Sequence, residues 1–221
     1  MLTRDGIKKL FVHPLWMLLA IPTLGYIYVL INREPQAVWM LYTDLDDLIP
    51  FIKAFIIPYA IWMPFLYLTL IFFFFKDRAT YYRTLLAYVI SVLTCYVIYT
   101  IFQTTVPRAE LVGDDLLSRL VMFVYTNDAP FNCFPSIHCL SSYLLFRAAS
   151  QSKAIGRGTT IGIGIISWSI ILSTVFVKQH VVMDVFAGVM LGHFIFTLAG
   201  RLLKSRSGVP LHEGQRSYLS P

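Results

Sequence analysis

Charge is scarce in this sequence. Only 14% of its 221 residues are Asp, Glu, Lys or Arg, whereas a soluble domain carries about 25%. Hydrophobic residues make up 57% of the chain, and the mean hydropathy is +0.67. A water-soluble fold has too little polar surface to cover so many apolar residues. The composition therefore excludes an ordinary soluble protein and indicates one bundle of helices in a bilayer.

Two further absences restrict the function. The three cysteines, Cys95, Cys133 and Cys139, are odd in number and lack the spacing of a metal site or a disulfide framework. Three free thiols are the favoured interpretation. A basic stripe with interleaved aromatics is also missing, because the basic residues flank apolar segments. The net charge of +6 therefore does not indicate a nucleic acid partner.

Six apolar segments approach the length of about 20 residues that a membrane helix needs. The first is too long for a signal peptide and lacks a small-residue cleavage site, so we expect a retained helix. The fourth is the least apolar, since it contains three serines and His138. We predict an all-α, polytopic membrane protein, a six-transmembrane-helix bundle, with spans near 13–32, 51–75, 84–103, 134–149, 159–178 and 180–200.

The spans form one predicted domain, residues 1–200, followed by a basic tail, 201–221, that we expect to be disordered. Lys and Arg are enriched on the cytoplasmic side of membrane proteins. Of the 18 basic residues, 13 fall on the side that holds both termini. Both termini are therefore predicted to be cytoplasmic, in a cell membrane.

Ionisable residues at membrane depth indicate function, because each is costly to bury. His180 and Asp184 are four residues apart and share one helical face. The carboxylate can accept the proton of one imidazole nitrogen, which leaves the other free to act as a nucleophile. A purely structural hydrogen bond has the same spacing, so this pair alone does not establish catalysis.

A second polar element precedes the fourth predicted span. Residues 132–138 are Asn-Cys-Phe-Pro-Ser-Ile-His, and Pro and Ser suit the start of a helix. A helix N-terminus binds phosphate through its free backbone N–H groups and its dipole. Ser136 adds a hydroxyl donor, and His138 can donate a proton to a leaving oxygen.

Two cations lie near the same predicted face. The guanidinium of Arg108 suits the oxygens of a phosphoryl group, although an interfacial arginine can instead meet lipid headgroups. Lys178 can likewise contact phosphate or extend to the headgroups. Together with the His–Asp pair and the helix start, these residues predict phosphoryl transfer through a phosphohistidine, with no metal and no cofactor.

These motifs resemble those of the type 2 phosphatidic acid phosphatase superfamily, the lipid phosphate phosphatases. Residues 135–138, Pro-Ser-Ile-His, are similar to the family's Pro-Ser-Gly-His. Residues 173–184 keep the spacing of Ser-Arg, five residues, His, three residues, Asp. The first signature, Lys, six residues, Arg-Pro, is partial: Arg108 matches its arginine, but Ile101 and Ala109 replace the lysine and the proline.

The resemblance covers residues 84–200 and implies a role for each matching position. His180 attacks phosphorus, Asp184 orients it, and His138 protonates the leaving group. The substrate is a phosphatidate-type lipid or a polyprenyl pyrophosphate such as undecaprenyl pyrophosphate, held at the outer membrane face. The positions expected to contact or support the phosphate oxygens are Gln103, Arg108, Ser136, Ile137 and Lys178.

Two departures leave the acceptor open. Ile137 replaces the glycine of the second signature, and Thr174 replaces the arginine of the third. A Pro-Ser-aliphatic-His variant without that arginine also resembles the inositol phosphorylceramide and sphingomyelin synthase branch, whose members transfer a phospho-headgroup to an alcohol. The chemistry is shared until the acceptor arrives, so water and an alcohol both remain alternatives.

Three other classes compete with this interpretation. His138, His180 and Asp184 are residue types that bind zinc, but a zinc site leaves the anion-binding helix start unexplained. A serine protease using Ser136 is disfavoured, because Pro135 and Ile137 crowd the position. A non-enzymatic lipid transporter is the third, although no inverted repeat is evident. A transporter should tolerate loss of His180 better than a phosphohistidine enzyme.

Overall fold

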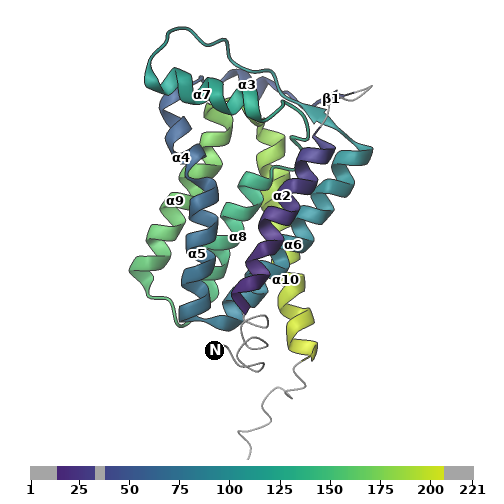
Figure 1. Ribbon diagram of the computed structural model, residues 1–221, viewed down its shortest axis with the longest axis vertical. Helices are drawn as coiled ribbons and strands as arrows, with labels where there is room; N and C mark the ends of the chain where they lie inside the picture. The colour runs from purple at the N-terminus through teal and green to yellow at the C-terminus, as the bar shows by residue number, and fades with distance from the viewer. Residues whose placement is uncertain (1–13, 33–37, 207–221) are drawn as a thin grey trace, which may run out of the picture.

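The computed structural model describes residues 14–32 and 38–206. Helices lie side by side along one long axis, and a shorter helix with loops covers one end of the bundle (Figure 1). The elements are η1 Pro14–Leu19, α2 Ala20–Ile31, β1 Trp39–Met40, α3 Asp44–Asp47, η2 Lys53–Phe55, α4 Ile56–Ala60, α5 Trp62–Lys76, α6 Arg78–Ile101, β2 Thr104–Thr105, α7 Leu116–Asn127, α8 Ile137–Gln151, α9 Arg157–Phe176 and α10 Val182–Arg206.

Five helical segments in the described part of the chain are long and apolar enough to cross a membrane. They correspond to five of the six predicted spans, and they support a mostly helical membrane protein. The last helix continues to Arg206, beyond the predicted end at residue 200, while the rest of the expected tail lies outside the described residues. The five segments are Pro14–Ile31, Lys53–Lys76, Arg78–Ile101, Arg157–Phe176 and Val182–Leu203.

The sixth predicted span, 134–149, corresponds to α8, and the six-span count is not confirmed. Helix α8 has 15 residues and is about 22 Å long, shorter than a hydrocarbon core of roughly 30 Å. It packs against α5, α6, α9 and α10, and eight of its residues are buried. Because protein surrounds this helix, it can carry serines and a histidine that a lipid-facing helix would exclude.

A proline break shapes the second segment. Pro64 has no N–H to donate to the carbonyl of Ala60, and the helix is interrupted at Ile61, between α4 and α5. Tyr59 and Trp62 flank the break, and both contact the ring of His138. The interruption therefore places two aromatic side chains against a predicted site residue.

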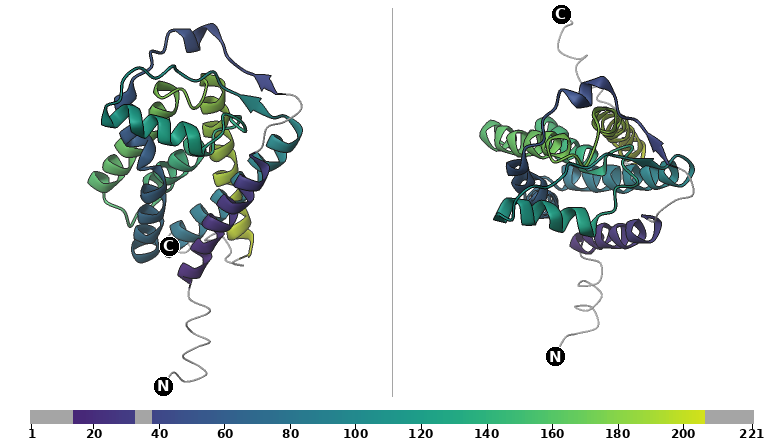
Figure 2. Two further views of the ribbon diagram at one scale, coloured as in Figure 1. Left: turned by 45° about the horizontal axis from the view of Figure 1, so that its top comes forward. Right: turned by 90° about the horizontal axis from the view of Figure 1, so that it is seen from above.

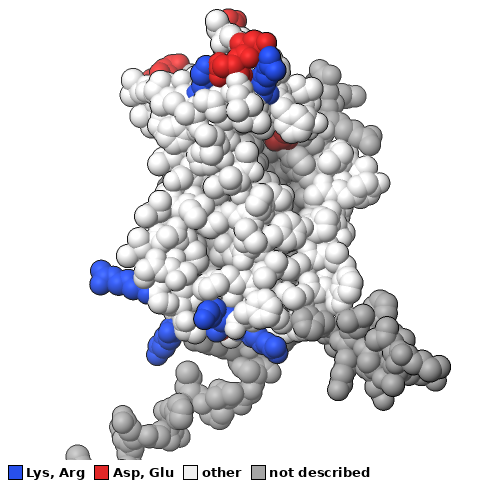
Figure 3. All heavy atoms as spheres, turned by 60° about the vertical axis from the view of Figure 1, so that its left-hand side comes forward, with Lys and Arg blue, Asp and Glu red and all other residues white. Residues whose placement is uncertain are grey.

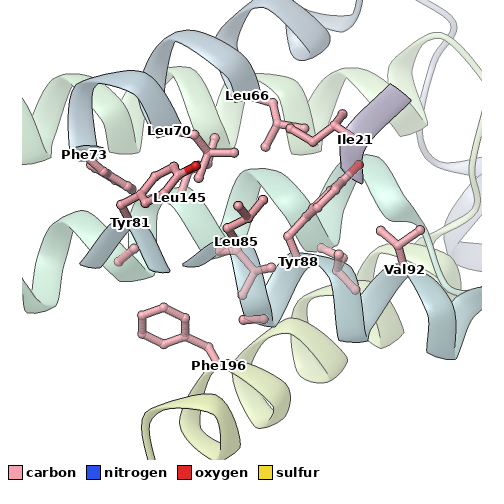
Figure 4. Close-up of a cluster of buried hydrophobic side chains, with 14 of the residues drawn as sticks. Ile21, Leu66, Leu70, Phe73, Tyr81, Leu85, Tyr88, Val92, Leu145 and Phe196 are labelled. Carbon is pink, nitrogen blue, oxygen red and sulfur yellow. The ribbon is translucent and has the colours of Figure 1, made fainter. Parts of the chain in front are cut away.

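An apolar cluster joins the helices along the bundle, starting at the end where α5 and α6 meet (Figure 4). Phe73, Tyr81 and Phe196 are each exposed by 1% or less, and the Tyr81 hydroxyl donates to the carbonyl of Pro14 at 2.8 Å. In a bilayer such contacts stabilise through close packing rather than exclusion of water. This cluster holds together the helices whose other ends form the polar end of the bundle.

Two long connections, residues 38–55 and 102–136, cover that polar end. They pair through β1 and β2, in parallel, with Trp39 opposite Thr104, and α7 lies across the ends of the membrane helices (Figures 1 and 2). Acidic and basic side chains gather together here, whereas the other end of the face in Figure 3 shows basic ones alone. Through these two connections, residues that are far from α10 in the sequence come to lie over its start.

Candidate active site

The predicted His–Asp pair lies at the start of α10, but not on one helical face: α10 begins at Val182, so His180 is in the turn before the helix and Asp184 is in its first turn. Nδ1 of His180 lies 3.3 Å from Oδ2 of Asp184, and the same oxygen accepts the N–H of Val181 at 3.0 Å. Asp184 is fully buried. The tautomer with its proton on Nδ1 donates to this oxygen and leaves Nε2 with its lone pair, as the candidate nucleophile.

His138 joins this pair from the first turn of α8. Its ring centroid lies 5.7 Å from that of His180, 4.7 Å from that of Tyr59 and 4.0 Å from that of Trp62. The Trp62 indole is itself fixed, because its N–H donates to the Ser141 hydroxyl at 2.7 Å. The structure therefore brings His138, His180 and Asp184 together and restricts the orientation of His138.

The start of α8 packs directly on the first turns of α10. Ser136 is the N-cap: its Oγ accepts the N–H of Cys139 at 3.3 Å, and its own N–H donates to the carbonyl of Asp184 at 3.1 Å. The approach is close because Gly188 has no side chain, and a Cβ there would lie 2.6 Å from the carbonyl oxygen of Ser136. Ile137 begins the helix, beside His138.

Arg108 reaches the same region from the connection after α6. Its guanidinium donates to the carbonyls of Tyr125 and Asp128 and to Oε1 of Gln179 at 3.2 Å, and it stacks on the Tyr125 ring at 4.5 Å. Gln179 directly precedes His180. The predicted cation is therefore near His180, already engaged by two backbone carbonyls and one side chain.

The remaining two predicted phosphate contacts are occupied by the protein. The Lys178 ammonium donates to the carbonyls of Asp46 at 3.0 Å and Ile49 at 2.6 Å, so it anchors the first connection over α10. Gln103 donates from Nε2 to Oδ1 of Asn132 at 2.8 Å and reaches the site through that buried residue. The structure does not bring either side chain against the histidines.

A cavity of about 500 Å³ extends from the histidines into the bundle. Its volume is in the range of small-molecule sites, and its lining is mostly aromatic and aliphatic. Val29 of α2 and Phe123 of α7 line it and are also 67% and 66% exposed on the outside, so the cavity reaches the surface between these helices. Its polar end is formed by Asp128, Asn132, His138, Gln179 and His180.

Asp128 is a site residue that the sequence analysis missed. It follows α7, and its Oδ1 accepts from the Tyr28 hydroxyl at 3.0 Å and from the Asn32 amide at 3.1 Å. These partners are about 100 residues away in the sequence. A polar residue in an external connection carries no signal of this burial, because only the folding of α7 onto α2 creates it.

Replacing Asp128 by asparagine should stabilise the protein in a pH-dependent way. Burial raises the pKa of Asp128 above its usual value, so the folded protein holds this proton more tightly than the unfolded chain. Wild-type stability is therefore lost as the pH rises through the folded-state pKa, and Asp128→Asn removes that loss. The thermal unfolding midpoint in detergent should increase more near pH 8 than near pH 4, the usual pKa of an aspartic acid.

The control for this measurement is Asp114→Asn, since Asp114 is exposed and pairs with Arg119. That pairing lowers the pKa of Asp114, so its replacement should not raise the midpoint at either pH. An equal increase for Asp128→Asn at both pH values would contradict a half-buried, titrating carboxyl group.

Comparison with known proteins adds no assignment. No protein-family model, no curated protein and no solved structure matches this chain.

Proposed function

We propose that this protein is an integral membrane phosphatase of lipid phosphates or pyrophosphates that acts through a phosphohistidine. The observation that carries the proposal is the His138, His180 and Asp184 cluster at the polar end of a largely apolar cavity. A lipid phosphate has the same division into an apolar chain and a charged head.

Nε2 of His180 attacks phosphorus while the bond from phosphorus to the lipid oxygen breaks. His138 donates a proton to that leaving oxygen, and Asp184 balances the positive charge that develops on the His180 imidazole. Water then attacks the phosphohistidine, His138 takes the proton, and inorganic phosphate leaves with His180 restored. A single histidine serves as acid and then as base, and the rings of Tyr59 and Trp62 restrict its orientation.

Arg108, Ser136 and the backbone amide near Ile137 are the groups we assign to the phosphate oxygens. Nε2 of Gln179 has no hydrogen-bond partner within the described residues; if the Gln179 side chain turns away, one N–H of Arg108 becomes free for the substrate, while the carbonyls of Tyr125 and Asp128 keep the guanidinium in place. The Ser136 oxygen accepts from Cys139, which leaves its hydroxyl proton to donate. Lys178 supports the site by holding the loop above α10.

The same geometry supports the substrate class and the orientation that we propose. The cavity reaches the surface between α2 and α7, where a polyprenyl or diacylglycerol chain can enter from the membrane. Basic residues at the opposite end of the bundle include Lys76, Arg78 and Arg157, at helix termini. By the enrichment of Lys and Arg in the cytoplasm, both termini are cytoplasmic and the site faces outward.

A phospho-headgroup transferase is the second candidate, and Thr174 is the residue that favours it. Thr174 occupies the position of the family's arginine, is fully buried, and donates its hydroxyl to the carbonyl of Ile171 at 2.8 Å. This position supplies no cation to a terminal phosphate monoester. A phosphodiester headgroup has less negative charge and requires less compensation.

Phosphate release by the purified protein in detergent with EDTA tests the proposal. We expect release from at least one of undecaprenyl pyrophosphate, phosphatidic acid and phosphatidylglycerol phosphate, because the chemistry proposed for the histidines needs no metal. A parallel reaction with ceramide and a phosphodiester lipid tests transfer to an alcohol. Transfer without phosphate release would replace the phosphatase by the transferase, and failure of both with folded protein would exclude either enzyme.

A further inference from the structure

Cys133 lies beside the His180 and Asp184 pair, in the loop before α8. Its Sγ atom, a ring nitrogen of His180 and a carboxylate oxygen of Asp184 all lie within 4.8 Å of one another. The three residues are exposed by 3%, 8% and 0%. Cys133 has no role in the proposed phosphoryl transfer, yet it completes a group of three donors of different types at one point.

Asp184 also has an oxygen that the protein leaves unused. Oδ2 is engaged by His180 and Val181, whereas Oδ1 is buried without a hydrogen-bond partner in residues 14–32 and 38–206. A buried carboxylate oxygen without a partner is costly. A cation between Asp184, His180 and Cys133 would satisfy it.

The donor set selects the kind of cation. Thiolate, imidazole and carboxylate together suit Zn²⁺, whereas Mg²⁺ and Ca²⁺ prefer oxygen alone. Tetrahedral coordination at about 2.0–2.3 Å places ligand atoms roughly 3.3–3.8 Å apart, so the cluster must contract by about 1 Å. Cys133 is in a loop, where such a shift requires no helix to move, and the fourth position remains for water.

We propose that Cys133, His180 and Asp184 form a Zn²⁺ site that switches the enzyme off. Binding replaces the thiol proton of Cys133, which passes to solvent. The ion either binds the Nε2 lone pair of His180 or replaces the hydrogen bond between His180 and Asp184. Attack on phosphorus requires both this lone pair and this hydrogen bond. The inhibitory consequence rests on the proposed phosphatase function, whereas the binding site does not.

Co²⁺ tests the site without any substrate, because a tetrahedral Co²⁺–thiolate bond gives a charge-transfer absorption band. The full chain, stripped with EDTA and desalted in detergent, should show this band, saturate at one ion per chain and lose the band when Zn²⁺ is added. Cys133→Ser should weaken binding by roughly tenfold or more, the loss typical even of an outer-sphere partner. Cys95→Ser is the matched control, since Cys95 is equally buried in α6, and it should keep the band.

Absence of the band from wild type, or an undiminished band in Cys133→Ser, would overturn the site. If Cys133→Ser does not fold, alkylation of wild type followed by mass spectrometry gives the same answer. Cys133 lines the cavity, so Zn²⁺ should slow its modification but not that of Cys95. Equal rates of Cys133 modification with and without Zn²⁺ would overturn the site.

Phosphate release separates the two proposals. Zn²⁺ should abolish phosphate release by wild type, and EDTA should restore it. The Cys133→Ser variant should need a Zn²⁺ concentration higher by roughly tenfold or more for the same inhibition. A cobalt band in a protein without phosphatase activity would leave the binding site standing and remove the phosphatase. A band in an active protein that Zn²⁺ does not inhibit would overturn the switch.

Discussion

His180→Ala should reduce lipid phosphate release by about a thousandfold or more, because loss of a nucleophile removes the whole covalent pathway. The change leaves the Val181 N–H on the Asp184 carboxylate, so α10 should still begin at the same place. The measurement is the initial rate of phosphate release in detergent with EDTA, on the lipid that wild type hydrolyses best.

The matched control is His193→Ala, on the same helix. His193 is exposed, and its Nδ1 lies 2.8 Å from the Tyr143 hydroxyl, away from the cavity. This variant should retain a rate close to that of wild type. If His180→Ala kept a tenth of the wild-type rate or more, His180 would not be the nucleophile, and a transporter or a different catalytic group would have to be considered.

Gly188→Ala should both destabilise the protein and disable the site. The new Cβ would lie 2.6 Å from the carbonyl oxygen of Ser136, a backbone atom that cannot rotate away. Helices α8 and α10 must separate, which displaces His138 from His180. Overpacking of this kind costs about 1–3 kcal/mol. The thermal unfolding midpoint and the rate of phosphate release should both fall, the rate by a larger factor than the loss of folded protein explains.

Gly162→Ala in α9 is the control, because a Cβ there meets no atom within 4 Å. Alanine is favoured over glycine in a helix by roughly 0.5–1 kcal/mol, so this variant should be as stable as wild type or slightly more so. A Gly188→Ala protein with the stability and activity of wild type would show that close packing of α8 on α10 does not position the histidines.

Patterns confined to one stretch of chain could be predicted from the sequence. Long apolar runs predict five helices that are long and apolar enough to cross a membrane, because a bilayer requires each backbone to satisfy its own hydrogen bonds. The sequence singles out His180 and Asp184 as partners, but not the way they meet: α10 begins at Val182, so His180 lies in the turn before the helix and the two do not share a helical face. The short helix α8 shows the limit: its length and polarity make sense only once neighbouring helices replace lipid around it.

Only the tertiary structure decided what surrounds the histidines. Asp128 is held by residues about 100 positions away, and Cys133 meets Asp184 across the start of two helices. Lys178, a candidate phosphate ligand by sequence, is bound instead to loop carbonyls 129 and 132 positions away. Such contacts depend on how connections fold over the bundle, and no local periodicity encodes them, whereas the long apolar helices follow from the chain itself.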